Sequence, residues 1–467
     1  MSGQPVMPKS IPPMAAPFMP GNAGSTPPPS VPLGFLAAAG LGLCAFGFAV
    51  ALAADRFVTT PSHPGALAAV HVGMLAFLTT AVLGAAHQFS PVVGRRPLRS
   101  VTIARVTMAG MILTGWLIPS GFAHGPEALV AAGGVIGSIT VALAAWNLSG
   151  PLSARDGGVP LAGLRLSVGF LVITVAFGVV YAFNRQTGWF PLLPNRVLAH
   201  AHLGLLGWLG ITYVAVAEKL WPMFLLAHRP TARAGAWAVG LLATGTPVLA
   251  TGLLFAITPL GWLGGVIAAA GAVCHLVSLY TAVKHRRRAL ELLHGYLFTS
   301  AAFLVIAIGL GALAGAADVD YATRSSIVVA EVTALAGWLS LAVVGHAHKI
   351  VPFISYTVLR SRGVKFGPTG RPLMFGDLFD LRLARASLVT GSLGFTAALV
   401  GVLVRSSAIV SAGGFLVAVT GVIATTNLVR GPRRAARTLS TDARPRAAAV
   451  AAPSVPPASA RPTVVTS

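Results

Sequence analysis

The chain has 467 residues, of which 55% are hydrophobic and only 9% are charged, and its mean hydropathy is +0.79. This composition excludes an ordinary soluble domain and indicates a polytopic protein embedded in a lipid bilayer. The formal net charge of +22 would suit a nucleic-acid-binding protein, but the basic residues lie in loops between apolar segments and in the C-terminal tail, so nucleic acid is excluded as a partner.

Twelve apolar segments are long enough to cross a bilayer as helices of ~20 residues. They are 33–54, 65–90, 101–122, 127–147, 162–183, 195–222, 233–256, 260–282, 292–315, 326–357, 384–404 and 408–428. We therefore predict an all-α membrane domain over 31–428. Residues 1–30, rich in Pro, predict a disordered cytoplasmic arm, and residues 429–467 predict a disordered basic tail that is attracted to anionic lipid.

Three of these segments repeat one pattern. The pattern carries His71, His202 and Val332 at one position, Phe77, Trp208 and Trp338 at a second, His87, Glu218 and His348 at a third, and Pro91, Pro222 and Pro352 at a fourth, with offsets of 131 and 130 residues. Glycine pairs and the two asparagines Asn147 and Asn427 also recur. The spacing predicts three pseudo-symmetric units of four helices, at about 31–150, 160–283 and 290–428.

Basic residues predict the orientation of the spans. The loops after the second, eighth, tenth and twelfth spans are rich in Lys and Arg, whereas the alternate loops hold only Arg56, Arg185, Arg196 and Arg324. The positive-inside rule then places both termini in the cytoplasm, with the chain in the cell inner (plasma) membrane. An even number of helices per unit makes the units parallel, so residues at one repeat position share one depth.

Histidines at the outer depth predict a cofactor site. An imidazole in a bilayer is costly unless it is paired, wet or bound to a cofactor. His71 and His202 share one repeat position, so two packed second helices can present them to opposite sides of a haem iron. Arg196 lies one turn outward of His200, where a guanidinium can hold a haem propionate or extend to the helix end. Glu331, at the same depth, is expected to exchange protons or to pair with an outer histidine.

The spacing of His200 and His202 separates their roles. Residues two apart on a helix point about 200° apart, so these histidines do not easily bind the same metal. They can bind two centres on opposite sides of one helix, or one can be a ligand while the other forms a hydrogen bond. The same alternatives hold for His346 and His348.

A second layer is predicted near the cytoplasmic face. It contains His87, Glu218 and His348 at one repeat position, with His346 half a turn away. Such groups can bind copper, iron or zinc, relay protons, or simply end their helices.

These motifs resemble a known family. The pattern HAHLGLLGWLG, followed by Glu-Lys-Leu-Trp-Pro, is similar to the H-x-H helix of subunit I of the heme-copper oxidases, in the C-type oxidase and nitric-oxide-reductase branch. The resemblance implies twelve helices in three four-helix arcs. It also implies that His200 and His202 correspond to the H-x-H haem ligands, and that His71 corresponds to the second-helix ligand. The family's paired copper ligands on the seventh helix have no match, because 233–256 contains no histidine.

The resemblance implies a haem-binding protein in electron transfer or in oxygen or nitric oxide chemistry. Haem b is the expected cofactor and copper the second candidate, with accessory subunits as further partners. The two cysteines, Cys44 and Cys274, provide no C-x-x-C-H motif for covalent haem, so the electron donor would be cytochrome c, a cupredoxin or a quinol. Two alternatives remain: a non-enzymatic copper- or haem-handling or gas-responsive protein, and a transporter.

Overall fold

The computed structural model describes residues 26–228, 232–367 and 370–450, and these are helical apart from their loops and one isolated β-bridge between Phe366 and Pro372. Within the described residues, twelve helical segments are long and apolar enough to cross a membrane, which confirms the predicted number. Nine of the spans are single helices that lie outside the centre of the bundle. They are α1 (Ser30–Leu52), α5 (Val101–His124), α6 (Ala128–Leu152), α7 (Gly158–Thr187), α10 (Ala232–Leu254), α11 (Thr258–Lys284), α12 (Leu292–Ala316), α14 (Leu381–Leu403) and α15 (Ser407–Val450).

The other three spans are the segments that carry the histidine pattern, and they are the most buried. The first consists of α3 (Pro64–His71), η1 (Val72–Thr79) and α4 (Thr80–Gly94), the second of α8 (Arg196–His202), η2 (Leu203–Gly210) and α9 (Ile211–Leu225), and the third is α13 (Tyr321–Ser361). In their most hydrophobic windows 67%, 78% and 61% of residues are buried, against 28–44% in the other nine spans. The histidines of these spans therefore lie inside the bundle rather than against lipid.

Two of the three central spans contain a π-helical stretch at matching places. η1 begins immediately after His71, and η2 begins immediately after His202, 131 residues later. In a π-helix the backbone bonds run from residue i to i+5, so the helix is wider than an α-helix, and such segments are frequent at functional sites. α13 is α-helical throughout and has Val332 at the corresponding position. The π-helical stretch thus occurs in the two central spans that have a histidine at this repeat position, and not in α13, which has a valine there.

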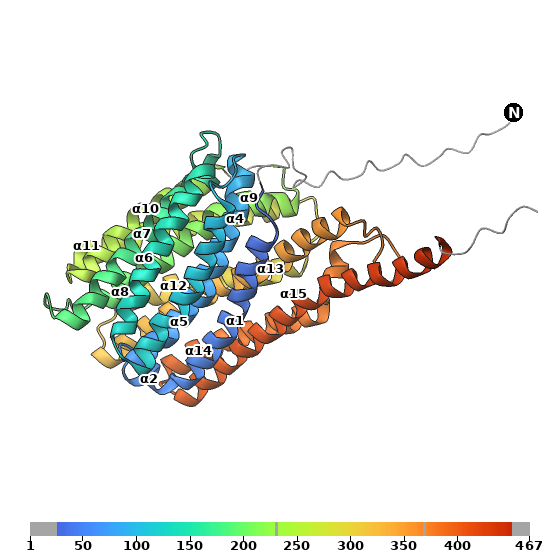
Figure 1. Ribbon diagram of the computed structural model, residues 1–467. Coiled ribbons are helices and arrows are strands. Elements are labelled where there is room, and N and C mark those ends of the chain that lie inside the picture. Colours follow the sequence, from blue (N-terminus) through green and yellow to red (C-terminus); the bar gives the residue numbers. More distant parts are fainter. Residues whose placement is uncertain (1–25, 229–231, 368–369, 451–467) are drawn as a thin grey trace, which may run out of the picture.

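The first and last of the described spans, α1 and α15, pack side by side (Figure 1). α5 packs on α6, α10 on α11 and α14 on α15, while α6 also contacts α7. The contact between α1 and α15 depends on two glycines. A Cβ on Gly47 would lie 2.1 Å from the backbone nitrogen of Ala418, and a Cβ on Gly414 would lie 2.5 Å from that of Ala51. Only glycine allows the two backbones to approach this closely.

Equivalent residues make equivalent contacts in the first and last thirds of the chain. The side-chain oxygen of Asn147 accepts a hydrogen bond from the Ser100 backbone at 2.8 Å, and that of Asn427 accepts one from the Asp380 backbone at 2.7 Å. Each bond lies just before the third helix of its predicted unit, α5 or α14. Two asparagines that the sequence pattern pairs therefore have the same structural role.

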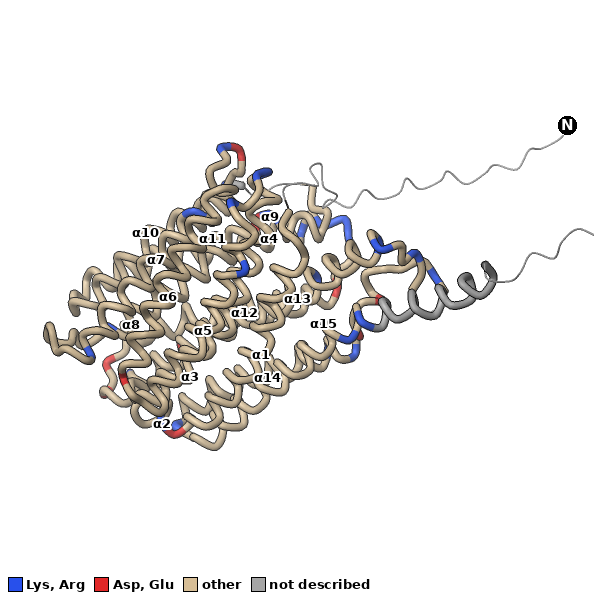
Figure 2. The backbone as a smooth tube through the Cα atoms, in the orientation of Figure 1, with Lys and Arg blue, Asp and Glu red and all other residues tan. Residues whose placement is uncertain are grey.

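Charge is unevenly distributed along the bundle: Lys and Arg gather near the ends of α4, α9 and α13 and on the part of α15 around 430–433 (Figure 2). α13 extends to Ser361, past its predicted end, and is followed by the short 3-10 helix η3 (Phe375–Leu378). α15 likewise continues to Val450, so the segment predicted as a disordered tail is helical over 429–450, and 451–467 lie outside the described residues. Most of the predicted N-terminal arm, residues 1–25, also lies outside them. The short helix α2 (Ala54–Thr59) was not predicted.

The contact between α1 and α15 predicts the effect of one glycine substitution. Gly47→Leu should lower the free energy of unfolding by about 1–3 kcal/mol, because a side chain cannot fit between the two backbones. Gly240→Leu is the matched control, since nothing lies within 4 Å of a Cβ on Gly240 of α10. The measurement is the thermal unfolding midpoint of each variant in detergent micelles. Equal midpoints for the two variants would contradict the close approach.

Candidate functional site

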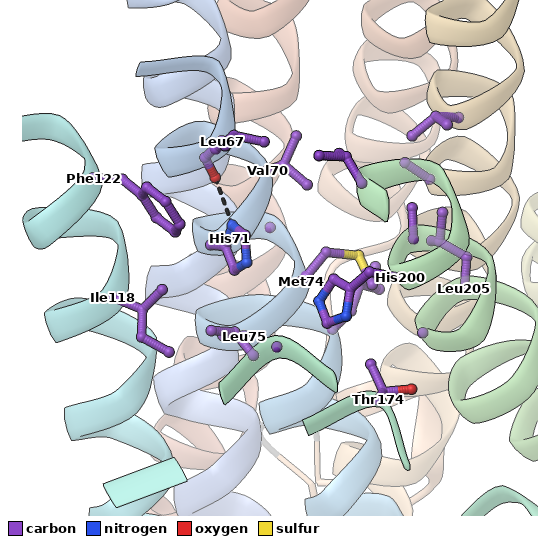
Figure 3. Close-up of a pocket in the computed structure, with 18 of the residues that line it drawn as sticks. Leu67, Val70, His71, Met74, Leu75, Ile118, Phe122, Thr174, His200 and Leu205 are labelled. Carbon is purple, nitrogen blue, oxygen red and sulfur yellow. Dashed lines mark hydrogen bonds between the residues drawn. The ribbon is translucent and has the colours of Figure 1, made fainter. Parts of the chain in front are cut away.

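A cavity of about 310 Å³ lies between the first two central spans and α7. We call it the histidine cavity, because His71 from α3 and His200 from α8 both line it (Figure 3). Its walls are mainly apolar side chains of the central spans, α5, α6 and α7, with further residues from α1, α14 and α15. Two cationic side chains, Arg185 and Arg196, also line it. The cavity therefore combines an apolar interior with two imidazoles and two guanidinium groups.

His71 is held in one tautomer. Its Nδ1 lies 2.7 Å from the carbonyl oxygen of Leu67, one turn earlier in α3 (Figure 3). Because a carbonyl can only accept, Nδ1 carries the proton and Nε2 keeps its lone pair. The ring also packs against Phe122, with centroids 5.1 Å apart. This is the arrangement in which a histidine is oriented as a ligand through Nε2.

His200 lies beside His71. Their ring centroids are 6.4 Å apart and the ring planes differ by 21°. Phe177 of α7 packs on His200 at 5.5 Å, and Gly178 makes room for the imidazole, since a Cβ there would lie 3.1 Å from Cε1. Nδ1 of His200 has no hydrogen-bond partner among the described residues, although it is buried. A buried imidazole nitrogen without such a partner is costly, and both ring nitrogens of His275 are in the same situation.

The two arginines of the cavity have different partners. Arg185 forms an ion pair with Glu127 at 2.5 Å, and its guanidinium lies over the Phe122 ring at 5.4 Å. Arg196 donates to the carbonyl of Leu193 at 3.0 Å. A guanidinium has five N–H donors, so each arginine can also bind a carboxylate in the cavity.

His202 has a different neighbour from the one predicted. Its Nδ1 is bonded to the carbonyl of Leu198 at 2.8 Å, and its Nε2 lies 3.4 Å from Oε1 of Glu331 on α13. The predicted pair of His71 and His202 is therefore replaced by His71 and His200, because His200 and His202 face different neighbours from one helix. The expectation that these two histidines serve separate partners agrees with this geometry. Glu331 was expected either to exchange protons or to pair with an outer histidine, and its contact with His202 is of the second kind.

The inner residues lie at separate places in the bundle. His87 stacks on Phe35 at 5.5 Å, and His348 stacks on Tyr296 at the same distance. Glu218 accepts a hydrogen bond from Ser278 at 2.5 Å. No group of three or more His, Cys, Asp or Glu side chains that could hold a metal ion occurs in the described part of the chain. The predicted convergence of His87, Glu218 and His348 is thus not found there, since each side chain packs against a helix of its own third of the sequence.

His346 instead lies near two residues that the sequence analysis did not assign to a site. Its ring is 6.0 Å from Tyr213, which in turn is 5.3 Å from the buried His275. Sequence reasoning also missed Phe177, Tyr181 and Arg185 of α7. Their spacing of four residues, which places them along one face of a helix, was the available signal.

Comparison with known proteins adds no family to this description. No protein-family model matches the chain, and no curated protein matches it.

The contact between His202 and Glu331 predicts a coupled effect of two substitutions. His202→Leu should reduce stability by about 3 kcal/mol, because it leaves the largely buried Glu331 carboxylate without this partner. The double variant His202→Leu/Glu331→Leu should recover most of the loss, since two apolar side chains replace the pair. The measurement is thermal unfolding in detergent of the two single variants and of the double variant. The difference between the double variant's loss of stability and the sum of the two single losses is the coupling energy between His202 and Glu331. Additive effects would contradict the pairing.

Proposed function

We propose that the chain is a haem-binding integral membrane protein in which His71 and His200 would hold the iron of a b-type haem. The observation that carries the proposal is the 6.4 Å separation of their ring centroids at one cavity. Two iron–nitrogen bonds of about 2 Å, together with the distance from each nitrogen to its ring centre, require centroids roughly 6 Å apart. The two rings therefore have the spacing of a bis-imidazole iron site.

Other properties of the histidine cavity support the same group. Its apolar walls suit the macrocycle, while Arg185 and Arg196 are available for the two propionates. The Nδ1 hydrogen bond of His71 to Leu67 leaves Nε2 free as an iron ligand. Nδ1 of His200 has no hydrogen-bond partner among the described residues. Binding of iron by this nitrogen would offset the free-energy cost of burying it without a partner.

Electron transfer is the activity that this ligation favours. His71 and His200 would hold the haem iron between them, and a haem held by two imidazoles would supply electron transfer rather than binding of oxygen or nitric oxide. When bound, the haem would accept and release single electrons. The protein's residues would fix the iron ligands, neutralise the propionates and exclude water.

The architecture supports a relationship to subunit I of the heme-copper oxidases. Three buried central spans, matching π-helical segments after His71 and His202, and matching contacts of Asn147 and Asn427 are consistent with three four-helix units. In this proposal the haem lies between the first and second units. The gathering of Lys and Arg at one end of the bundle supports an inner-membrane orientation in which both termini are cytoplasmic and the histidine cavity lies near the outer surface.

The proposed ligands predict which histidines the haem requires. Protein purified from haem-replete cells should show a b-type reduced-minus-oxidised spectrum, and His71→Ala or His200→Ala should lower the ratio of haem to protein at least about tenfold. His202→Ala and His348→Ala are matched controls that should retain the spectrum, because neither side chain lines the cavity. The proposal fails if the wild-type protein is colourless. It also fails if His202→Ala loses haem while His200→Ala retains it.

A further inference from the structure

An unbroken run of aromatic rings connects the protein surface to His200. Trp189 packs on Phe190 with centroids 6.0 Å apart, and Phe190 packs on Tyr181 at 5.4 Å. Tyr181 then stacks on Phe177 at 4.9 Å, and Phe177 stacks on His200 at 5.5 Å. The run begins in the loop between α7 and α8 and ends at one of the two proposed haem ligands.

The loop that carries Trp189 is held in a fixed conformation. The side-chain oxygen of Asn184 accepts from the backbone N–H of Phe190 at 2.8 Å, and its amide nitrogen donates to the carbonyl of the same residue at 3.0 Å. Asn184 is itself buried, and α7 ends at Thr187 and is capped by Gly188, which has a φ of 59° and donates its N–H to the Asn184 carbonyl. Trp189 directly follows and is 77% exposed. A fixed loop thus presents a large aromatic side chain outward while its neighbour Phe190 points into the run.

We propose that Trp189 and its loop are the docking point for a reduced, soluble one-electron carrier protein, and that the aromatic run is the path of the electron to His200. This inference rests on the proposed haem site. The carrier is oxidised by one electron and the haem iron is reduced by one electron, with no bond formed or broken. In the proposed orientation Trp189 lies at the outer aqueous end, where such a carrier would approach.

An exposed tryptophan suits a transient protein interface. Tryptophan is enriched among the few residues that dominate binding energy, and redox partners bind through small surfaces that release quickly. Tryptophans also gather at membrane interfaces without any partner. The continuity of the rings as far as His200, together with the Asn184 contacts, distinguishes Trp189 from such a lipid anchor. Trp237 of α10 is 65% exposed and has no ring contact with the run. It therefore serves as the control for an exposed tryptophan that is not connected to His200.

The test is the rate at which reduced carriers reduce the haem of the full-length protein. Wild type, Trp189→Ala, Trp189→Phe and Trp237→Ala are each mixed in stopped flow with reduced cytochrome c and with a reduced cupredoxin. We expect at least one carrier to reduce the wild type, Trp189→Ala to slow that reaction about tenfold, and Trp189→Phe to restore most of the rate. Trp237→Ala should match the wild type.

Each other outcome overturns the inference. It is wrong if neither carrier reduces the wild type, if a quinol alone does so, or if Trp189→Ala and Trp237→Ala behave alike. The haem spectrum and its complete reduction by dithionite are recorded for every variant beforehand. A preparation without haem refutes the proposed function itself, whereas a haem-loaded, dithionite-reducible protein with an unchanged carrier rate refutes only the docking point.

Discussion

Most of the structure's intramembrane histidines are constrained by one hydrogen bond. In each of these, Nδ1 donates to the backbone carbonyl four residues earlier on the same helix, which satisfies one nitrogen and turns Nε2 away from the backbone. The bond occurs at His71, His87, His202, His346 and His348, with lengths of 2.7–2.9 Å. Because an unsatisfied polar group in an apolar interior is costly, this bond lowers the cost of placing an imidazole in a membrane helix. The bond also leaves Nε2 as the nitrogen that remains available for a ligand or for a second hydrogen bond.

His200 lacks this bond, and the difference explains its place in the site. Its Nδ1 finds no partner among the described residues, while Phe177, Gly178 and His71 surround its ring. The neighbouring His202 has both the backbone bond and the contact with Glu331. Two histidines separated by a single alanine therefore have different surroundings: His202 has hydrogen-bond partners for both ring nitrogens, whereas Nδ1 of His200 has none among the described residues.

The sequence predicted much of the fold but not the pairing within the site. Hydropathy and length gave the twelve spans, and helical periodicity correctly separated His200 from His202. The choice of partner for His71 depends on how each helix is rotated about its axis. Helices in lipid are apolar on nearly all sides, so no polar face reveals that rotation, and the π-helical segments η1 and η2 change it further. For the same reason, shared depth did not bring His87, Glu218 and His348 together.

The close packing of α1 on α15 has a consequence for biosynthesis. Of the twelve described spans, α1 is synthesised first and α15 last, yet Gly47 and Gly414 bring their backbones into direct contact. α1 must therefore remain in the bilayer without this partner until α15 has been synthesised. Neighbouring hairpins such as α5 with α6 and α10 with α11 can assemble earlier, since their partners emerge one after the other. The contact between α1 and α15 therefore forms only after the other described spans have been synthesised.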